Sequence, residues 1–182
     1  MDAISTNTET LSVQITYLKQ QRRPARQAPP RPPCITALMR AEAPPVHFYR
    51  YLFNRVGEPH KWVSRRYMLD DMLASIIHDP DVYIYVPYYK GVPCGFSEID
   101  ARPSEHPKGK VEIKFLGLMP EVHRLGIGRW FFHNVVDLAW SLDPTEVLIE
   151  TCTADHPAAL PLYQKFGFTP YDIGRGVIEW RG

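Results

Sequence analysis

The residues best suited to chemistry lie in one short turn, residues 123–128, with the sequence HRLGIG. The turn falls between an apolar run that begins at Val111 and an amphipathic run that ends near Trp140. A helix start carries backbone N–H groups without partners in the helix, and the helix dipole adds positive charge there. Two glycines let an anionic group approach such a backbone closely. The turn therefore predicts a cradle for a phosphate or pyrophosphate group.

A strand before the turn and a helix after it must hold this cradle. The residues from Val111 read as a buried strand, and those up to Trp140 read as a helix with one apolar face. A Gly-x-Gly turn between a strand and a helix also occurs for steric reasons alone. The rest of the chain therefore has to distinguish an anion cradle from an ordinary tight turn.

The composition is that of one globular domain with a tail. The chain has 182 residues and a net charge of +1, so no overall field favours nucleic acid or an acidic membrane. No apolar run reaches membrane-spanning length, and the first residues lack the apolar stretch of a secretory signal. Cys34, Cys94 and Cys152 are scattered, which predicts free thiols in a reducing compartment, with neither disulfides nor a metal site. We expect a cytoplasmic protein.

Residues 1–34 differ from the rest of the chain and are expected to lie outside the main domain, which spans residues 35–182. Apolar and polar residues alternate from Leu11 to Tyr17, which predicts an extra edge strand over residues 11–18. Residues 22–33 hold five prolines and four arginines and should be extended. This run suits either a strap or linker, which we favour, or a tail that binds an adaptor or an anion.

The main domain reads as an alternation of strands and helices. The pattern predicts a strand at 35–40, helices at 44–56 and 70–78, and strands at 82–89 and 94–100. After the opening strand and helix come a strand at 146–153, a short helix at 155–166, and one or two strands broken near Gly174 to Gly176. The order is strand, two helices, three strands, helix, strand, helix, strand.

Three motifs in this order resemble the GNAT acyltransferase superfamily. HRLGIG is similar to that family's Q/R-x-x-G-x-G/A pyrophosphate loop. DHPA at 155–158 and LYQKFGF at 162–168 resemble its N-x-x-A…L-Y-x-x-x-G-F segment, and GVPCGF at 91–96 looks like the hairpin before its central strand. The resemblance covers about Ile35 to Trp180. His123, Arg124 and Asp155 depart from the residues that are common in the family at these positions, and Pro161 lies inside the short helix.

The resemblance implies an α/β (α+β) fold with a mixed, mainly antiparallel central sheet. The sheet should have about six to seven strands, splay at the central strand, and be flanked by about four helices. It also implies acetyl-CoA as the acyl donor, held at the pyrophosphate by the amides of residues 124–129 and by Arg124 or Arg129. The Leu118 amide is the candidate donor to the thioester carbonyl. The implied cofactor-binding residues are Leu116, Leu118, Met119, His123, Arg124, Leu125, Gly126, Ile127, Gly128, Arg129, Thr151, Asp155, Ala158 and Tyr163.

By the same resemblance, Tyr163 corresponds to the tyrosine that protonates the leaving thiolate. A phenol is neutral at pH 7 and can donate to a thiolate. The acceptor amine must lose a proton before it attacks, and Glu112 is the first candidate base because it lies on the central strand, as in the histone-acetylating branch. Glu98, on the neighbouring strand, is the second candidate, and a chain of waters is the third.

The first two helices and their connection form the acceptor wall in this family, which implies Tyr49, Trp62, Arg65 and Arg66 as substrate-binding residues. We predict an N-acetyltransferase that moves an acetyl group from acetyl-CoA to a primary amine by direct attack in a ternary complex. The amine belongs to a small molecule or a peptide, and the protein is a monomer or homodimer without nucleic-acid or membrane partners. The alternative is a non-catalytic CoA-binding module that regulates or recruits a partner.

Overall fold

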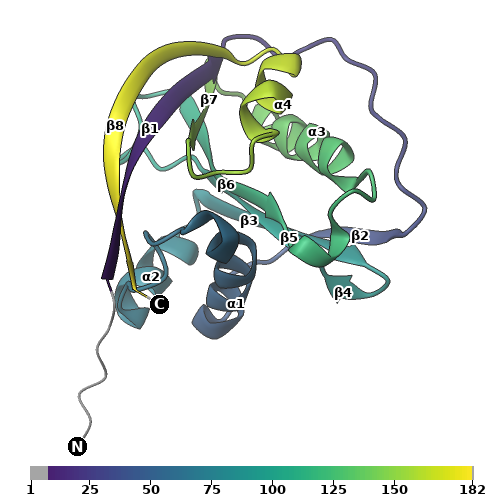
Figure 1. The fold of residues 1–182 in the computed structure, drawn as a ribbon. Helices are drawn as coiled ribbons and strands as arrows, with labels where there is room; N and C mark the ends of the chain where they lie inside the picture. Colours follow the sequence, from purple (N-terminus) through teal and green to yellow (C-terminus); the bar gives the residue numbers. More distant parts are fainter. Residues whose placement is uncertain (1–7, 182) are drawn as a thin grey trace, which may run out of the picture.

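An eight-stranded sheet runs through the computed structural model, which describes residues 8–181 (Figure 1). Its order is β2-β3-β5-β6-β7-β1-β8, and the short β4 pairs with β3. The only parallel pair in that order is β6 with β7. The strands are β1 Thr8–Gln20, β2 Ile35–Arg40, β3 Val82–Tyr89, β4 Val92–Pro93, β5 Gly95–Asp100, β6 Lys110–Leu118, β7 Glu146–Cys152 and β8 Thr169–Arg181.

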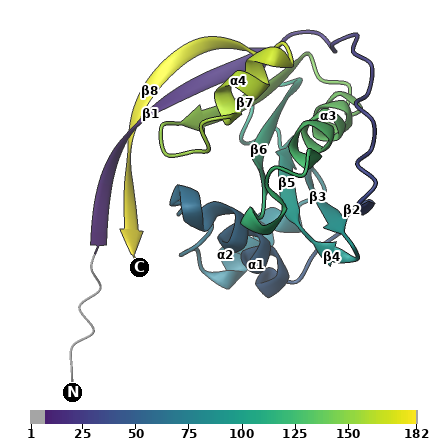
Figure 2. The ribbon, with the colours of Figure 1, turned by 45° about the vertical axis from the view of Figure 1, so that its right-hand side comes forward.

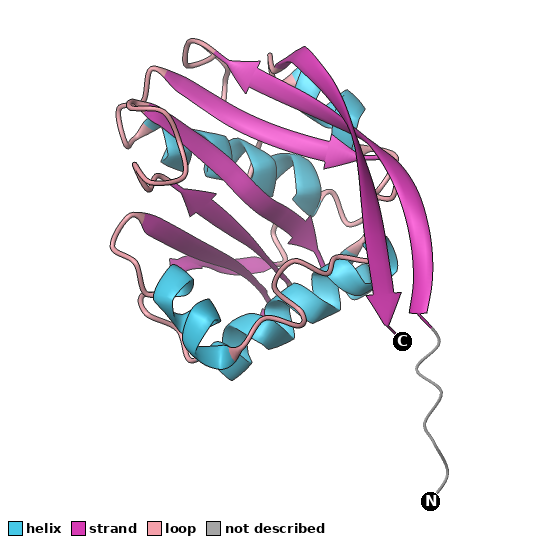
Figure 3. Ribbon diagram, turned by 90° about the vertical axis from the view of Figure 1, so that its left-hand side faces the viewer, coloured by secondary structure: helices cyan, strands magenta, loops and turns pink. Residues whose placement is uncertain are grey.

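Helices cover both faces of this sheet, as the view in Figure 3 shows. One layer holds α1 Val46–Gly57 and α2 Asp70–Ile77, and the other holds α3 Ile127–Trp140 and α4 Ala159–Lys165. Each layer buries its own apolar cluster against the sheet. The side chains at the centres of the two clusters include Tyr49, Leu52, Phe53 and Leu73 on the first face, and Phe131, Phe132, Val135 and Phe168 on the second. The mixed, mainly antiparallel sheet with four helices is confirmed.

The central strand β6 changes partners along its length. It pairs with β5 over most of its course, whereas its pairing with β7 runs only from Lys110 to Ile113. Beyond that point β6 continues to Leu118 and β7 to Cys152 without pairing to each other. The sheet therefore opens between these two strands, which is the expected splay at the central strand.

The N-terminal strand lies inside the sheet, so the expected edge position is wrong. β1 pairs antiparallel with β7 on one side and with β8 on the other. Its Leu18 side chain is fully buried. The strand also runs from residue 8 to residue 20, longer than expected, and with β8 it forms the long curved ribbon of Figures 1 and 2. Alternating residues predict a strand but do not reveal which strands flank it.

The arginine- and proline-rich segment connects β1 to β2, the edge strand at the far end of the sheet from β8 (Figure 1). Along this path Arg23 pairs with Asp137 of α3 at 3.1 Å, and the Arg26 guanidinium lies 5.3 Å from the ring centre of Phe166. These contacts fit the strap that we favoured over a free tail.

Most predicted elements agree with the structure to within a few residues. β8, however, is one unbroken strand, and Gly174 and Gly176 pair with Ile15 and Val13 of β1. Pro161 falls in the first turn of α4, where a helix does not use the backbone N–H that proline lacks. Cys34, Cys94 and Cys152 form no disulfide within residues 8–181. Among residues 8–181, no helix is long and apolar enough to cross a lipid bilayer.

Candidate active site

The turn that is predicted to be the cradle lies where β6 ends and α3 begins. The chain passes through the short 3₁₀ turn η2, Pro120–Val122, and then Gly126 stands at the start of α3 with φ of 75°. Arg124 also has a positive φ, of 64°. This left-handed conformation is open to glycine and turns the chain sharply into the helix. The first N–H groups of α3 therefore lack partners in the helix and are available to a ligand.

Both cradle glycines leave room that no neighbouring side chain fills. A Cβ built on Gly126 has no other atom within 4 Å, and one on Gly128 meets only a methyl of Leu118, at 3.8 Å. By contrast, a Cβ on Gly117 would lie 2.3 Å from Val56, so that glycine is required by packing. The space at Gly126 and Gly128 fits the close approach of a phosphate to the backbone.

A cavity of about 230 Å³, which we call the cradle cavity, opens beside this turn. It lies between the end of β6, the start of α3 and the start of α4. Arg124, Tyr163 and three histidines supply its polar side chains. The lining residues are His60, Leu116, Leu118, Val122, His123, Arg124, Gly126, Ile127, Gly128, Phe131, His156, Ala158, Ala159, Leu162 and Tyr163.

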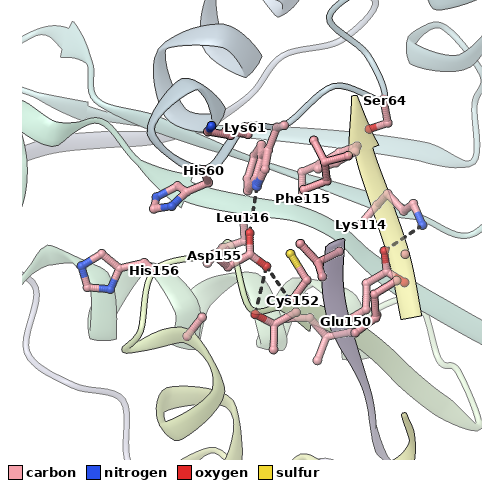
Figure 4. A pocket seen from close by; sticks show the side chains of 18 of the residues that line it. His60, Lys61, Ser64, Lys114, Phe115, Leu116, Glu150, Cys152, Asp155 and His156 are labelled. Atoms are coloured by element: carbon pink, nitrogen blue, oxygen red, sulfur yellow. Dashed lines mark hydrogen bonds and ion pairs between the residues drawn. The ribbon is translucent and has the colours of Figure 1, made fainter. Parts of the chain in front are cut away.

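A second cavity, of about 270 Å³, continues from the first along the opening between β6 and β7 (Figure 4). We call it the junction cavity. Its walls come from the connection after α1, from β6 and β7, from β1 and β8, and from α4. The residues common to the two cavities are His60, Leu116, His156, Ala159 and Tyr163. The two spaces therefore meet at one place, where a long ligand and a second molecule could come together.

The backbone of β6 turns hydrogen-bonding groups toward this opening. The Met119 N–H donates to the Cys94 carbonyl at 2.8 Å, so Met119 faces β5 with its backbone. Successive N–H groups of a strand point to opposite sides. The N–H groups of Leu118 and Leu116 therefore point away from β5, toward the gap that β7 has left. The Leu118 carbonyl, on the same side, lies 3.0 Å from Nε2 of His123.

Tyr163 projects from α4 into the place where the two cavities meet. Its ring packs against Phe132 with 4.9 Å between ring centres, and only 7% of the residue is exposed. Burial, assisted by the negative charge of Asp155, raises the pKa of the phenol well above its ordinary value. Tyr163 is therefore neutral at pH 7, which is the form that can donate a proton.

Asp155 joins the two walls of the junction cavity. One carboxylate oxygen accepts hydrogen bonds from the Thr151 hydroxyl at 2.9 Å and the Cys152 N–H at 2.8 Å. The other oxygen accepts from the indole N–H of Trp62, also at 2.9 Å, across the cavity (Figure 4). Thr151, Asp155 and Trp62 thus lie together, and all three line the junction cavity.

Glu98, the second candidate base, is fully buried and engaged. Its carboxylate accepts a hydrogen bond from the Tyr49 hydroxyl and one from Arg65 Nη2 at 2.9 Å. It lines neither of the two cavities. Tyr49 is fully buried as well, and burial, together with the charge of Glu98, raises the pKa of its phenol. Tyr49, Arg65 and Glu98 therefore form a closed polar contact beneath α1.

Glu112, the first candidate base, lies in a third hollow that continues from the junction cavity. This polar groove shares Lys114, Ile149 and Glu150 with the junction cavity. Burial raises the pKa of Glu112, while Lys114, whose ammonium lies 3.2 Å from the carboxylate, opposes that rise. Glu112 precedes Leu116 by four residues, which is about 13 Å along a strand.

Six of the predicted contact residues line neither cavity, and two of them, Tyr49 and Arg65, are those already described in the contact with Glu98. Met119 is buried in the cluster beneath α1, because it follows Leu118 on the strand and faces the other way. Leu125 and Arg129 are exposed on the turn and on α3. Arg66 stacks on Trp180 of β8, with its guanidinium 4.4 Å from the ring centre.

Two histidines that sequence reasoning did not select, His60 and His156, lie between the two cavities. The rings of His60 and His156 are 6.2 Å apart between centres, and those of His156 and His123 are 5.7 Å apart. The three histidines come from three separate segments: the 3₁₀ turn η1 Glu58–His60, the β6–α3 turn and the β7–α4 loop. No local motif links them, so only the fold could bring them together.

Solved structures share this fold at low sequence identity. The GCN5-related N-acetyltransferase from Sphaerobacter thermophilus is 15% identical, with a TM-score of 0.61, over 93% of this chain and 52% of that one. The GCN5-related N-acetyltransferase from Kribbella flavida is 15% identical, with a TM-score of 0.59, over 96% of this chain and 60% of that one. The chain thus spans about half to three fifths of the length of these two proteins.

A shorter neighbour is matched over most of its own length. An aminoglycoside acetyltransferase from an uncultured soil metagenomic sample, solved with trehalose, is 14% identical with a TM-score of 0.57, over 71% of this chain and 86% of that one. A comparison with curated protein sequences gives no match. The model of the acetyltransferase (GNAT) family matches residues 47–168, well over half of the chain, and the chain therefore belongs to the acetyltransferase (GNAT) family.

Proposed function

We propose that this protein transfers an acetyl group from acetyl-CoA to a primary amine by direct attack, with both substrates bound at once. The observation that carries the proposal is the meeting of two cavities at Leu116 and Tyr163. One cavity begins at an anion cradle on a helix start, and the other leads to a polar groove. Such a pair suits a donor with a phosphate-bearing arm and a separate acceptor.

The cradle side suits the donor. The amides of residues 124–129 would hold the pyrophosphate, and Arg124, which lines the cavity, would add positive charge. The open space at Gly126 and Gly128 gives the phosphates room to reach these amides. Acetyl-CoA, when bound, supplies a thioester whose carbonyl carbon takes the amine and whose sulfur leaves as a thiolate.

Two groups at the meeting point would assist this transfer. The N–H groups of Leu116 and Leu118 point into the opening and would polarise the thioester carbonyl, because fixed N–H donors stabilise negative charge on an oxygen. Tyr163 would give its phenolic proton to the leaving sulfur. A buried phenol keeps that proton at neutral pH.

The junction cavity and the polar groove suit the acceptor. Trp62 and Phe115 provide an aromatic wall, with 5.3 Å between their ring centres. Glu150 and Lys114 lie where the cavity passes into the groove, and Glu112 lies further along. Aromatic faces and carboxylates favour a molecule that carries a protonated amine. Arg65, held on Glu98, would complete the wall as a positioning residue.

Cys152 also lines the junction cavity, which raises the question of a covalent acyl-enzyme. Burial and the nearby charge of Asp155 raise the pKa of this thiol, so the thiol form dominates at neutral pH. The thiol is a poor nucleophile compared with the thiolate. Direct attack by the amine is the better fit.

The test is incubation of the protein with acetyl-CoA and a panel of amines, followed by mass spectrometry of the products. The panel holds a diamine, an aminoglycoside and a lysine-containing peptide. We expect free CoA and one acetylated amine in equal amounts. Binding of acetyl-CoA without acetylation of any amine would instead favour the CoA-binding module, and absence of acetyl-CoA binding would overturn both readings.

A further inference from the structure

The neutral His60 ring carries its hydrogen on a different nitrogen from the other histidines at the cavities, and its hydrogen bond shows which. Its Nδ1 lies 3.3 Å from the Ala154 carbonyl oxygen. A carbonyl only accepts, so Nδ1 must carry the hydrogen. In the neutral ring the hydrogen on Nδ1 leaves Nε2 with a lone pair. Within residues 8–181, that Nε2 has no hydrogen-bond partner.

His156 has the opposite arrangement. Its Nδ1 lies 3.1 Å from the backbone N–H of Ala158, which can only donate. Nδ1 of His156 is therefore the acceptor, and Nε2 carries the hydrogen in the neutral ring. His123 donates from Nε2 to the Leu118 carbonyl, so its Nδ1 holds a lone pair, but His123 lines only the cradle cavity. Of the two rings that line both cavities, His60 is the one whose Nε2 is ready to receive a proton.

His60 also stands in the right place, because it lines both cavities where they meet. The acceptor must deliver its amine to the same place. Glu98 is closed off by Tyr49 and Arg65, and Glu112 lies in the next groove, where Lys114 and His106 face it. Both carboxylates are thus less direct acceptors for the proton of an amine at the meeting point.

From this geometry we infer that His60 is a further catalytic residue, whose Nε2 takes the proton of the acceptor amine. The inference rests on the proposed acetyl transfer. The acceptor reacts as the neutral amine, after the extra proton of its ammonium form has passed to water. As the N–C bond forms and the C–S bond breaks, one proton passes from the amine nitrogen to His60 and another from the Tyr163 hydroxyl to the sulfur. The imidazolium then loses its proton to water, and the phenolate regains one.

The charges around His60 fit this role. Burial lowers the pKa of its imidazole, and the positive partial charge of His156 and His123 acts in the same direction. Asp155 and the Ala154 carbonyl act in the opposite direction. On the neighbouring elements, Lys61 is paired with Glu9 of β1, and Arg124 lines the cradle cavity. The balance keeps His60 neutral, and able to accept a proton, at pH 7.

The test compares His60→Asn with His156→Asn in the full chain. Each asparagine preserves the hydrogen bond of Nδ1, since the side-chain amide can donate to Ala154 and its oxygen can accept from Ala158. We expect His60→Asn to lower kcat about 10²- to 10⁴-fold and to remove the fall in rate at acidic pH, as expected for the loss of a general base. His156→Asn should keep that acidic limb. Acetyl-CoA affinity, measured by calorimetry, should be retained in both variants.

A readout independent of activity is the tautomer of each ring, measured by ¹⁵N NMR in the unliganded protein. We expect the hydrogen on Nδ1 of His60 and on Nε2 of His156. The reverse tautomer for His60 would overturn the inference, as would an unchanged kcat and acidic limb in His60→Asn while the wild type acetylates an amine. A wild type that binds acetyl-CoA but acetylates no amine would overturn the proposed function itself, and the inference with it.

Discussion

Individual residues at the two cavities owe their chemistry to the partners that hold them. Tyr163 is kept neutral by its apolar surroundings, Asp155 is fixed by three donors, and the amide of Leu118 is turned into the opening by the pairing of the next residue. The sequence predicted Tyr163, Asp155 and the glycines because they belong to local motifs. His60 belongs to no such motif, and His156 belongs to one without being selected, since the meeting of the two rings depends on distant segments coming together.

The glycine at the start of α3 can be tested against a matched glycine elsewhere. Gly126 and Gly91 both have positive φ, and a Cβ on either would have no other atom within 4 Å. Gly126→Val and Gly91→Val should each destabilise the protein by about 1 kcal/mol or more, because an L-residue is disfavoured there. Only Gly126→Val should weaken acetyl-CoA binding. The expected loss is about tenfold or more, and a tenfold loss corresponds to ~1.4 kcal/mol. Calorimetric titration measures the acetyl-CoA affinity of each variant. Equal affinities of Gly126→Val and Gly91→Val would contradict the cradle.

At the scale of elements, the site depends on where strands stop pairing. β6 and β7 are parallel neighbours only from Lys110 to Ile113, and the cavities begin beyond that pairing. Hydrophobic patterning located nearly all of the strands and helices, because their residues alternate or recur with the helical period. It did not locate β1 within the sheet, because the pairing of strands far apart in the chain leaves no local signal.

Glu146, at the start of β7, contacts a residue of β6 and a residue just after the end of β1. Hydrogen bonds from Lys110 of β6 and from Gln21, just after β1, lower the pKa of its carboxyl from 4.5 to about 2. A depressed pKa stabilises the folded protein above pH 4.5, and this contribution is lost as the pH falls toward 2. Glu146→Gln should therefore lose less stability than the wild type between pH 5 and pH 2.5. Urea unfolding at both pH values measures the difference, and parallel losses would rule out this role.

At the scale of the whole molecule, the N-terminal segment belongs to the fold that makes the site. β1 lies between β7 and β8, and its Val13 and Ile15 line the junction cavity together with residues of β8. The strap then carries the chain across α3 to the far edge of the sheet (Figure 1). The family match begins at residue 47, so this strand lies outside the matched part while completing one wall of the site.

The contribution of β1 to stability can be measured with two substitutions on that strand. Leu18 is fully buried in the cluster beneath α3, whereas Ser12 is exposed. Leu18→Ala should lower the free energy of unfolding by about 2–5 kcal/mol, because it removes buried methyl groups and leaves a cavity. Ser12→Ala should change it by less than about 0.5 kcal/mol. A similarly small effect at Leu18 would mean that β1 is not part of the cooperative fold.

The most direct test of the account is the effect of Tyr163→Phe on turnover and on acetyl-CoA affinity. The variant keeps the ring that packs on Phe132 and removes only the hydroxyl at the meeting point of the two cavities. We expect kcat for amine acetylation to fall about 10²- to 10⁴-fold. The calorimetric Kd for acetyl-CoA should stay the same. A variant with the kcat of the wild type would contradict the role of Tyr163 as the acid.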